Sequence, residues 1–437
     1  MTKPRGETPW EPPDAPTRPQ YGVIAATTFV AVMLYLDRVC LSIVGAQMRP
    51  NLGLTDDQFD WLLSSFFLTY ALFQLPAGWV GDRYGPARVL AVYLCLWSVC
   101  TGLMGVATGF TGLLLLRLGC GLFEAGAYPL AAAIVGRSVP PADRGWASGW
   151  VAVGGRLGGA VAPVSTAWLA AAVVVPSAAV AVGGGLTVAG TAATDDGWRT
   201  PFIVYGAAGV IGAIVYGWLV RDRRADAAIP PSALPLPPLR EMVRSRPLGL
   251  ASAVQFASNF AWVFIITLFP DYLKAVYDTP TETRAWYQSL PLYAGIFGML
   301  GGGWVTDRLI RRLGRRWGRA VPMAGSRGLV GLAYLACPFA PDAETVTALL
   351  CVVAFATDLG IAPLWAYCQD IGGRHVGAVL GWANMWGNLG AFAAPKVLPW
   401  LRDVGGWDTA FGVCAGMQAV AAVAAAGIDA ARPIRDE

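Results

Sequence analysis

Long apolar stretches alternate with short polar loops along most of the 437 residues of this chain. A helix that crosses a bilayer needs about 20 mostly apolar residues, because each residue adds only ~1.5 Å along the helix axis. Twelve stretches are predicted to be spanning helices: 21–46, 59–80, 89–108, 110–136, 146–175, 200–220, 248–270, 286–306, 320–340, 345–369, 376–401 and 407–428. The pattern predicts an all-α membrane protein.

Polar segments divide the predicted helices into two groups of six. The predicted organisation is a cytoplasmic tail over 1–20, an N-terminal six-helix bundle over 21–220, a Pro-rich cytoplasmic linker over 221–247, a C-terminal six-helix bundle over 248–428 and a second cytoplasmic tail over 429–437. Proline-rich polar stretches do not continue a helix and act as semi-stiff spacers. The Ala/Gly/Val-rich stretch 173–196 fits either an extracellular loop or an extension of the fifth helix.

Arginines are concentrated in alternate loops, and this asymmetry predicts the orientation. The basic loops contain Arg83 and Arg88, then Arg137 and Arg144, then six arginines between 221 and 246, then six between 308 and 319, and then Arg374. Basic loops stay on the cytoplasmic side of a membrane. We therefore expect a multi-pass protein of the cell membrane with both termini in the cytoplasm.

The composition excludes several classes of protein. Only 14% of the residues are charged, against about 25% in an ordinary soluble domain. That excludes a water-soluble enzyme and a disordered chain, and a net charge of +4 is too weak to indicate a nucleic-acid partner. No catalytic triad, phosphate loop or metal cluster stands out, so no enzymatic activity, cofactor or metal is expected. The eight cysteines form no C-x-x-C pair and are expected to be buried thiols.

A short motif occurs at corresponding places in the two groups of helices. Gly78 is followed by Asp82 and Arg83 after the second span, and a glycine at 303 is followed by Asp307 and Arg308 after the eighth. We expect the two aspartates to bond to neighbouring helix termini or arginines and to latch one conformation, with Gly78, Asp82, Arg83, Asp307 and Arg308 as a gating motif. The duplicated motif resembles the loop motif of the major facilitator superfamily, and the resemblance covers the whole chain. It implies two six-helix bundles that rock around a central site.

Six residues are predicted to be ionisable groups near the bilayer centre, where each costs about 2.5–3.5 kcal/mol on insertion scales and indicates function by default. They are Asp37, Arg38, Arg117, Glu124, Arg156 and Asp358. Three positive and three negative charges suggest mutual neutralisation in a polar cavity. Structural ion pairs remain open as an alternative for Asp37 with Arg38 and for Arg117 with Glu124, and Arg156 could simply pair with Asp358 or Glu124. Spans seven and eleven add Gln255 with Asn259 and Asn384 with Asn388, which serve equally well as ligand contacts or as bonds between helices.

Around these charges the chain resembles one branch of the superfamily, the anion:cation symporters, which includes hexuronate, galactonate, sialic acid and vesicular glutamate carriers. The matching segments are 35–42 (YLDRVCLS), 64–70 (SSFFLTY), 117–129 (RLGCGLFEAGAYP), 198–202 (WRTPF) and 381–388 (GWANMWGN). The resemblance implies that Arg38 and Arg117 face an anionic substrate and that Asp37 and Glu124 handle protons. It also places Tyr35, Tyr70, Gln255 and Asn384 at sugar-acid contacts. Arg156 and Asp358 are additional cavity charges, which leaves room for a different substrate.

The expected function is transport of a small carboxylate, such as a hexuronate or galactonate, in symport with a proton or sodium ion. Deprotonated Glu124 would compete with the substrate for Arg117, and protonated Glu124 would release that arginine, so proton and substrate would be linked. We expect the carrier to work as a monomer in the lipid bilayer by alternating access. The alternatives are an efflux antiporter or exchanger of another small solute, which would favour a cavity with net negative charge, and a transporter-like anion sensor.

Overall fold

The structure is a computed structural model that describes residues 18–172, 196–220 and 239–431. Most of the predicted N-terminal tail, the stretch 173–195, much of the predicted linker and residues 432–437 lie outside the described residues. The helices are α1 (Arg18–Leu52), α2 (Asp56–Tyr84), α3 (Pro86–Met104), α4 (Phe110–Glu124), α5 (Ala127–Ser138), α6 (Arg144–Ala172), α7 (Arg199–Leu219), α9 (Leu239–Arg244), α10 (Arg246–Thr267), α11 (Phe269–Tyr277), α12 (Thr281–Ala336), α13 (Ala343–Leu359), α14 (Ile361–Ile371) and α15 (Val376–Ala426).

Some of these helices correspond to two spans, and some pairs of helices form one. Glycines with left-handed backbone, Gly314 (φ 76°) and Gly406 (φ 75°), divide α12 and α15 into two spans each. Two pairs, α4 with α5 and α13 with α14, each form one broken span, and α10 forms a span by itself. Eight helical stretches are long and apolar enough to cross a membrane, two of which, 282–339 and 373–426, hold a pair of spans. With α2 and α6, the described residues make the twelve spans that were predicted, and the all-α membrane fold is confirmed.

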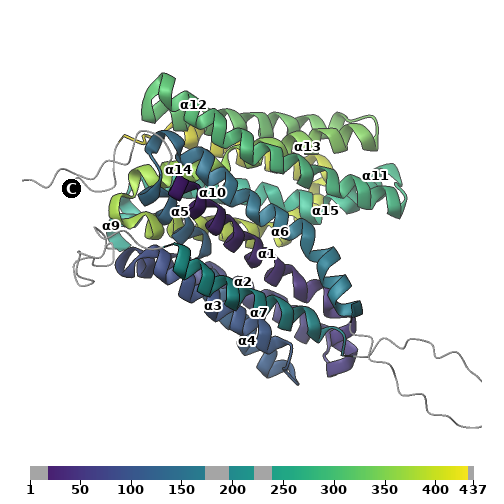
Figure 1. The fold of residues 1–437 in the computed structure, drawn as a ribbon. Coiled ribbons are helices and arrows are strands. Elements are labelled where there is room, and N and C mark those ends of the chain that lie inside the picture. The colour runs from purple at the N-terminus through teal and green to yellow at the C-terminus, as the bar shows by residue number, and fades with distance from the viewer. Residues whose placement is uncertain (1–17, 173–195, 221–238, 432–437) are drawn as a thin grey trace, which may run out of the picture.

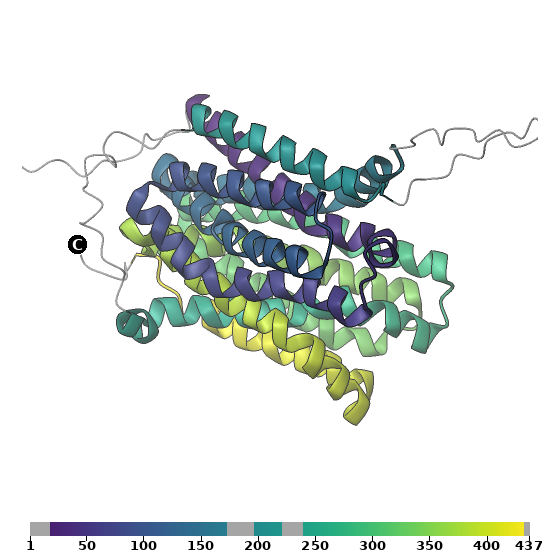
Figure 2. The same ribbon diagram turned by 90° about the horizontal axis from the view of Figure 1, so that it is seen from below.

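The spans form two bundles with their long axes in roughly the same direction (Figures 1 and 2). The N-terminal half contains α1 to α7, and the C-terminal half contains α10 to α15. The region predicted as a linker contains the short helix α9, and α10 begins at Arg246 instead of 248. It begins there because the Ser245 hydroxyl accepts a hydrogen bond from the Leu248 N–H and Pro247 suits the first turn of a helix.

Small residues let helices of the N-terminal half approach closely. A Cβ atom added at Gly154 of α6 would lie 2.5 Å from the carbonyl oxygen of Thr28, and one added at Gly158 would lie 2.4 Å from that of Val32. These two glycines are one turn apart and share a helix face. They bring the backbone of α6 against that of α1. Spanning helices often pack in this way, because in lipid no hydrophobic effect drives helices together and close van der Waals contact does so instead.

The hydrophobic core is shared by the two halves at one end only. One cluster joins α2, α5 and α6 to α10, α12, α14 and α15, with Val139, Val151, Met299, Leu364 and Ile371 among its members. The clusters towards the other end stay within one half, around Phe202 in the first and Phe411 in the second. The ribbons agree, because the two bundles lie together near α5 and α14 and spread apart towards the other end (Figure 1).

Large apolar side chains cover the outer faces of the helices. Those exposed over at least 60% of their surface include Trp61, Leu115, Val164, Trp168, Ile214, Trp218, Phe297, Trp304, Leu332, Phe392 and Val423. A soluble monomer rarely exposes contiguous apolar patches larger than a few hundred Å². An apolar surface of this extent is suited to contact with lipid chains.

Candidate functional site

A cavity of 180 Å³ lies between the two halves. Its lining is polar and aromatic: Tyr35, Arg38, Tyr70, Gln74, Tyr128 and Arg156 from the N-terminal half, and Gln255, Ser258, Asn259, Trp262, Arg327, Thr357, Asp358, Ile361, Trp365, Asn384 and Asn388 from the C-terminal half. Eight of the eleven residues predicted as substrate, proton or additional cavity groups line it. The other three, Asp37, Arg117 and Glu124, lie behind this lining.

Arg38 of α1 is held by aromatic rings and by one carboxylate. Its guanidinium carbon lies 5.2, 4.9 and 4.5 Å from the ring centroids of Tyr35, Phe66 and Tyr70. Its Nη2 donates to Oε2 of Glu124 at 3.3 Å. Rings on a guanidinium and a charge-assisted bond both restrict rotation, so this cation is held in place at the cavity wall.

Arg117 occupies the layer behind Phe66. Its guanidinium carbon lies 4.6 Å from the centroid of the Phe66 ring, and its Nε donates to the carbonyl oxygen of Leu62 at 3.1 Å. The side chain is 2% exposed and is not part of the cavity lining. The predicted partner of Glu124 was Arg117, two turns away on the same helix face, whereas in the structure Glu124 accepts its hydrogen bond from Arg38.

Asp37 is buried beside this layer, and Trp97, Glu124 and Arg117 are its neighbours. Both of its carboxylate oxygens accept no hydrogen bond among the described residues, and its electrostatic neighbours include Glu124 and Arg117. Asp37 and Arg38 are adjacent in sequence but do not bond to one another among the described residues, because successive side chains on a helix point about 100° apart. The adjacent pair therefore does not form the structural ion pair that the sequence left open.

Arg156 and Asp358 join the two halves across the cavity. Nη2 of Arg156 on α6 donates to Oδ1 and Oδ2 of Asp358 on α13 at 2.9 and 2.8 Å. The Arg156 guanidinium also lies 4.6 Å from the centroid of the Trp262 ring. Asp358 is 1% exposed and Arg156 is 19% exposed, so the cation is the more accessible member of this pair.

Arg327 is a cavity residue that sequence reasoning missed. It lies in the second part of α12, is 1% exposed, and donates from Nη1 to the carbonyl oxygen of Thr357 at 3.1 Å. The signal was present, because Arg327 is the only charged residue in the apolar run 320–340. Adding Arg327 to the six charges predicted near the bilayer centre gives four positive and three negative charges, so this set is no longer balanced.

Amide side chains line the cavity on the C-terminal side. Nε2 of Gln255 on α10 donates to Oδ1 of Asn384 on α15 at 2.5 Å, and Nδ2 of Asn388 donates to the backbone oxygen of Asn384 at 2.9 Å. Asn259 and Trp262 complete this face. The Gln255–Asn384 bond joins two helices, and both residues remain at the cavity surface, so the two roles considered for these amides are compatible.

The two carboxylates that hold cavity arginines stand at breaks in corresponding spans. Glu124 is the last residue of α4, and the next helix, α5, begins at Ala127. Asp358 is the second-to-last residue of α13, and the next helix, α14, begins at Ile361. Breaks in spanning helices are tolerated where the backbone borders protein or a water-filled cavity, and transporters place their sites there. The matching positions indicate a site built symmetrically from the two halves.

The repeated motif seals the end of the molecule that lies beyond α5 and α14. Asp82 at the end of α2 accepts hydrogen bonds from the N–H groups of Gly377 and Ala378 at the start of α15, at 3.0 and 2.8 Å. Asp307 of α12 likewise accepts from Gly145 and Trp146 at the start of α6, at 3.0 and 2.7 Å. Each aspartate thus caps a helix of the opposite half. We call this region the closed end.

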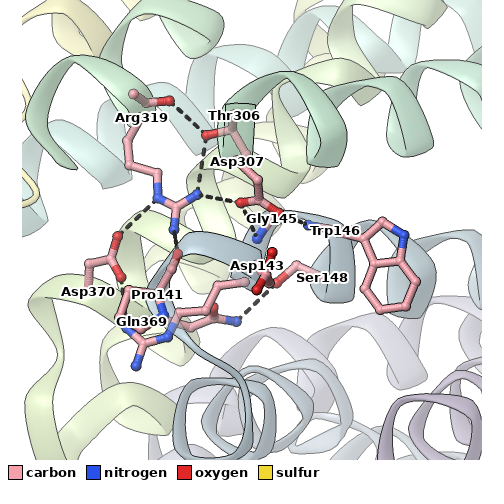
Figure 3. Close-up of polar contacts among 12 residues, drawn as sticks. Pro141, Asp143, Gly145, Trp146, Ser148, Thr306, Asp307, Arg319, Gln369 and Asp370 are labelled. Atoms are coloured by element: carbon pink, nitrogen blue, oxygen red, sulfur yellow. Dashed lines mark hydrogen bonds and ion pairs between the residues drawn. The ribbon is translucent and has the colours of Figure 1, made fainter. Parts of the chain in front are cut away.

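Arg319 is the centre of a further network at the closed end (Figure 3). Its guanidinium donates to Asp307 and Thr306 at 3.2 Å each, to Asp370 at 2.9 Å, and to the Pro141 carbonyl oxygen of the other half at 2.8 Å. Further bonds between the halves at this end join Arg144 to Asp370 (2.7 Å), Gln369 to Ser148 (3.0 Å) and Arg311 to Asp143. Arg319 is fully buried, and the carboxylates of Asp307 and Asp370 neutralise its charge.

The other residues of the motif have different places. A Cβ atom added at Gly78 would lie 2.1 Å from the carbonyl oxygen of Gly377, so only glycine allows α2 and α15 to touch there. Arg83 lies over the rings of Trp79 and Tyr84, and Arg308 lies over Trp304. The structure therefore brings Gly78, Asp82 and Asp307 into the contact between halves, and it places the two arginines on rings of their own helices.

Twelve spans in two halves, a cavity between them with charged walls, and a seal at one end are the features of a membrane transporter. The chain belongs to the Major Facilitator Superfamily, whose family model matches residues 27–395. The protein is therefore a multi-pass membrane transporter and not an enzyme.

Relatives and solved structures agree with this assignment. The chain is 30% identical to the probable sulfoacetate transporter SauU of Cupriavidus necator, with 92% of this chain and 91% of that protein covered. It is 27% identical to the hexuronate transporter of Bacillus subtilis, with 92% and 93% covered. The fold is similar to that of the fucose:proton symporter FucP of Escherichia coli, with a TM-score of 0.69, 17% identity and 92% and 98% of the two chains covered.

Proposed function

We propose that the protein is a secondary active transporter that carries a small organic anion in symport with protons. The observation that carries the proposal is the placement of Arg38 at the cavity wall, between aromatic rings and bonded to Glu124 at 3.3 Å. A fixed guanidinium binds a carboxylate or sulfonate through a two-pronged contact. The sugar-acid and sulfoacetate transporters among the relatives support an anionic substrate.

Glu124 supplies the link to protons in this proposal. While it is ionised it holds Arg38, and when it takes up a proton it releases the guanidinium to an incoming anion. Proton and anion then strengthen one another's binding by the same factor. Asp37, buried and without a hydrogen-bonding partner in the described part of the chain, is the second proton-carrying group. Tyr35, Tyr70, Gln255, Asn259 and Asn384 supply polar contacts to the body of the substrate.

Arg117 acts through its neighbours in this proposal. It lies behind Phe66, which is itself one of the rings on Arg38, so the two cations share a ring. Arg117 keeps the local potential positive and supports the position of Phe66. Its bond to the Leu62 carbonyl oxygen fixes α4 against α2.

The charge of the cavity argues against efflux of cations. Its lining has three arginines, Arg38, Arg156 and Arg327, and one carboxylate, Asp358. A positive wall repels a cationic drug and attracts an anion. We also propose that the closed end faces the cytoplasm of a monomer in the cell membrane, because the basic loops and both ends of the described chain lie there (Figure 1).

Binding and uptake of defined compounds test the proposal. Purified protein should be stabilised against heating by sulfoacetate, hexuronates or galactonate at millimolar concentration, more strongly at pH 5.5 than at pH 8, and not by the neutral sugars fucose or xylose. Proteoliposomes with an acidic exterior should accumulate the stabilising compound, which an anion sensor would not. Equal stabilisation by neutral sugars, or uptake that ignores the pH gradient, would contradict the proposal.

The closed end gives a prediction with two reciprocal controls. Asp82→Ala should speed hydrogen–deuterium exchange at the amides of Gly377 and Ala378, and Asp307→Ala should do so at Gly145 and Trp146, because each variant removes the cap on one helix start. A lost cap is worth roughly 0.5–2 kcal/mol, or about a 2- to 30-fold faster exchange. Exchange at the helix start that the altered aspartate does not cap should change less in each variant. Unchanged exchange in both variants would show that the caps do not hold the closed end.

A further inference from the structure

Two arginines from opposite halves converge on a single carboxylate in the cavity. Arg156 of the N-terminal half bonds to both oxygens of Asp358, and Arg327 of the C-terminal half is an electrostatic neighbour of the same carboxylate. All three side chains line the cavity. A carboxylate that bonds to one guanidinium and has a second as an electrostatic neighbour shows that this place in the cavity accepts an anionic group.

The two arginines have donors to spare. The Nε atoms of Arg156 and Arg327 are buried and have no hydrogen-bond acceptor among the described residues. Among the described residues, Arg327 donates one hydrogen bond, from Nη1 to the Thr357 carbonyl oxygen. A guanidinium has five N–H donors, and leaving buried donors unpaired is costly. A second anionic group beside Asp358 would satisfy them.

The charges of the cavity call for a ligand with more than one negative charge. Arg38, Arg156 and Arg327 against Asp358 leave a surplus of two positive charges on the described lining. Glu124 cancels one of these only while it is ionised and bonded to Arg38. Once Glu124 is protonated, a ligand with one negative charge leaves one cation of the lining uncompensated, whereas a ligand with two leaves none.

We propose that Arg156 and Arg327 form a second anion subsite, and that the substrate is a compound with acid groups at both ends. The inference rests on the proposed function, in which Arg38 binds the first acid group. The second acid group bonds to Arg156 and Arg327 next to Asp358. The substrate then bridges the two halves, since Arg38 belongs to α1 and Arg327 to α12.

Matched pairs of compounds test the subsite in the unaltered protein. D-glucarate and D-gluconate differ only in a carboxylate or a hydroxymethyl group at C6, and sulfoacetate and isethionate differ in the same way. In detergent or proteoliposomes at pH 5.5, the dianion of at least one pair should bind about 10- to 100-fold more tightly, as expected for one extra charged contact. Equal affinity within each pair that binds would overturn the subsite and leave the proposed function intact. Binding of neither member of either pair would also overturn the subsite, and binding of hexuronates or galactonate would then decide the proposed function separately.

Variants assign the preference to these residues. Arg327→Gln should lower the ratio of dianion to monoanion affinity towards 1, and Arg327→Lys, which keeps the charge, should lower it less. Arg38→Gln should weaken both members of a pair together, because it acts on the acid group that they share. If Arg327→Gln does not fold, Arg156→Gln serves in its place, and the selectivity of the unaltered protein still decides. An unchanged ratio in the folded variants would overturn the assignment.

Discussion

Arg38→Gln is expected to weaken carboxylate binding by about 30-fold to several thousand-fold, which corresponds to roughly 2–5 kcal/mol for losing one member of a buried charged contact. The expected loss is large because Arg38 is held in place by three rings and by Glu124. In the described part of the N-terminal half, Arg156 is the one other cation that lines the cavity. Isothermal titration with a stabilising compound in detergent measures it.

Two control variants sharpen this prediction. Arg38→Lys keeps the charge but not the fork or the stacking on rings, so it should bind with intermediate affinity. Arg117→Gln should lose less than Arg38→Gln, because Arg117 lies behind Phe66 and does not line the cavity. Full binding by Arg38→Gln would remove Arg38 from the site. A greater loss in Arg117→Gln would show that Arg117 contacts the substrate directly.

Glu124→Gln is expected to abolish accumulation driven by a pH gradient while exchange of substrate across the membrane continues. Glutamine can still accept a hydrogen bond from Arg38, but it cannot bind and release a proton, so the link between proton and anion is lost. In the unaltered protein, uptake should rise as the external pH falls, because protonation of Glu124 releases Arg38. In Glu124→Gln this dependence should flatten. Counterflow of labelled substrate and gradient-driven uptake in the same proteoliposomes measure both properties.

Asp358→Asn provides the comparison for this result. Asp358 stands at the corresponding break in the C-terminal half but bonds to Arg156 instead of Arg38. If Glu124 is the coupling group, Asp358→Asn should keep some response to the pH gradient. Accumulation by Glu124→Gln equal to that of the unaltered protein would show that another group carries the coupling.

The number and approximate limits of the spans could be predicted from the sequence, because a bilayer requires long apolar stretches and tolerates little else. The breaks in the fourth and tenth spans could not. Glu124 and Asp358 lie inside unbroken apolar runs, and the interruptions at Gly126 and Gly360 depend on how the halves meet. The residues gathered in the cavity were mostly recognisable, since a charged side chain inside a span is costly in lipid and faces the interior of the bundle.

Distances between helices account for the places where the prediction of the site differs from the structure. Spacing along one helix placed Arg117 beside Glu124, but the nearer donor, Arg38, comes from α1. Arg327 was overlooked because its run begins beside the basic loop at 308–319, where arginines are expected. The aspartates of the repeated motif were expected to meet helix termini or arginines, and only the structure shows that each reaches the opposite half.

The reciprocal caps of Asp82 and Asp307 also bear on how tightly the transporter binds in a measurement made from one side. A ligand presented at one side of the membrane reaches only those molecules whose site is open to that side, and its apparent dissociation constant rises as that fraction falls. The caps favour one orientation of the site at rest. Weakening them should therefore make the measured affinity poorer from one face of the membrane and better from the other, although no residue that touches the substrate has changed.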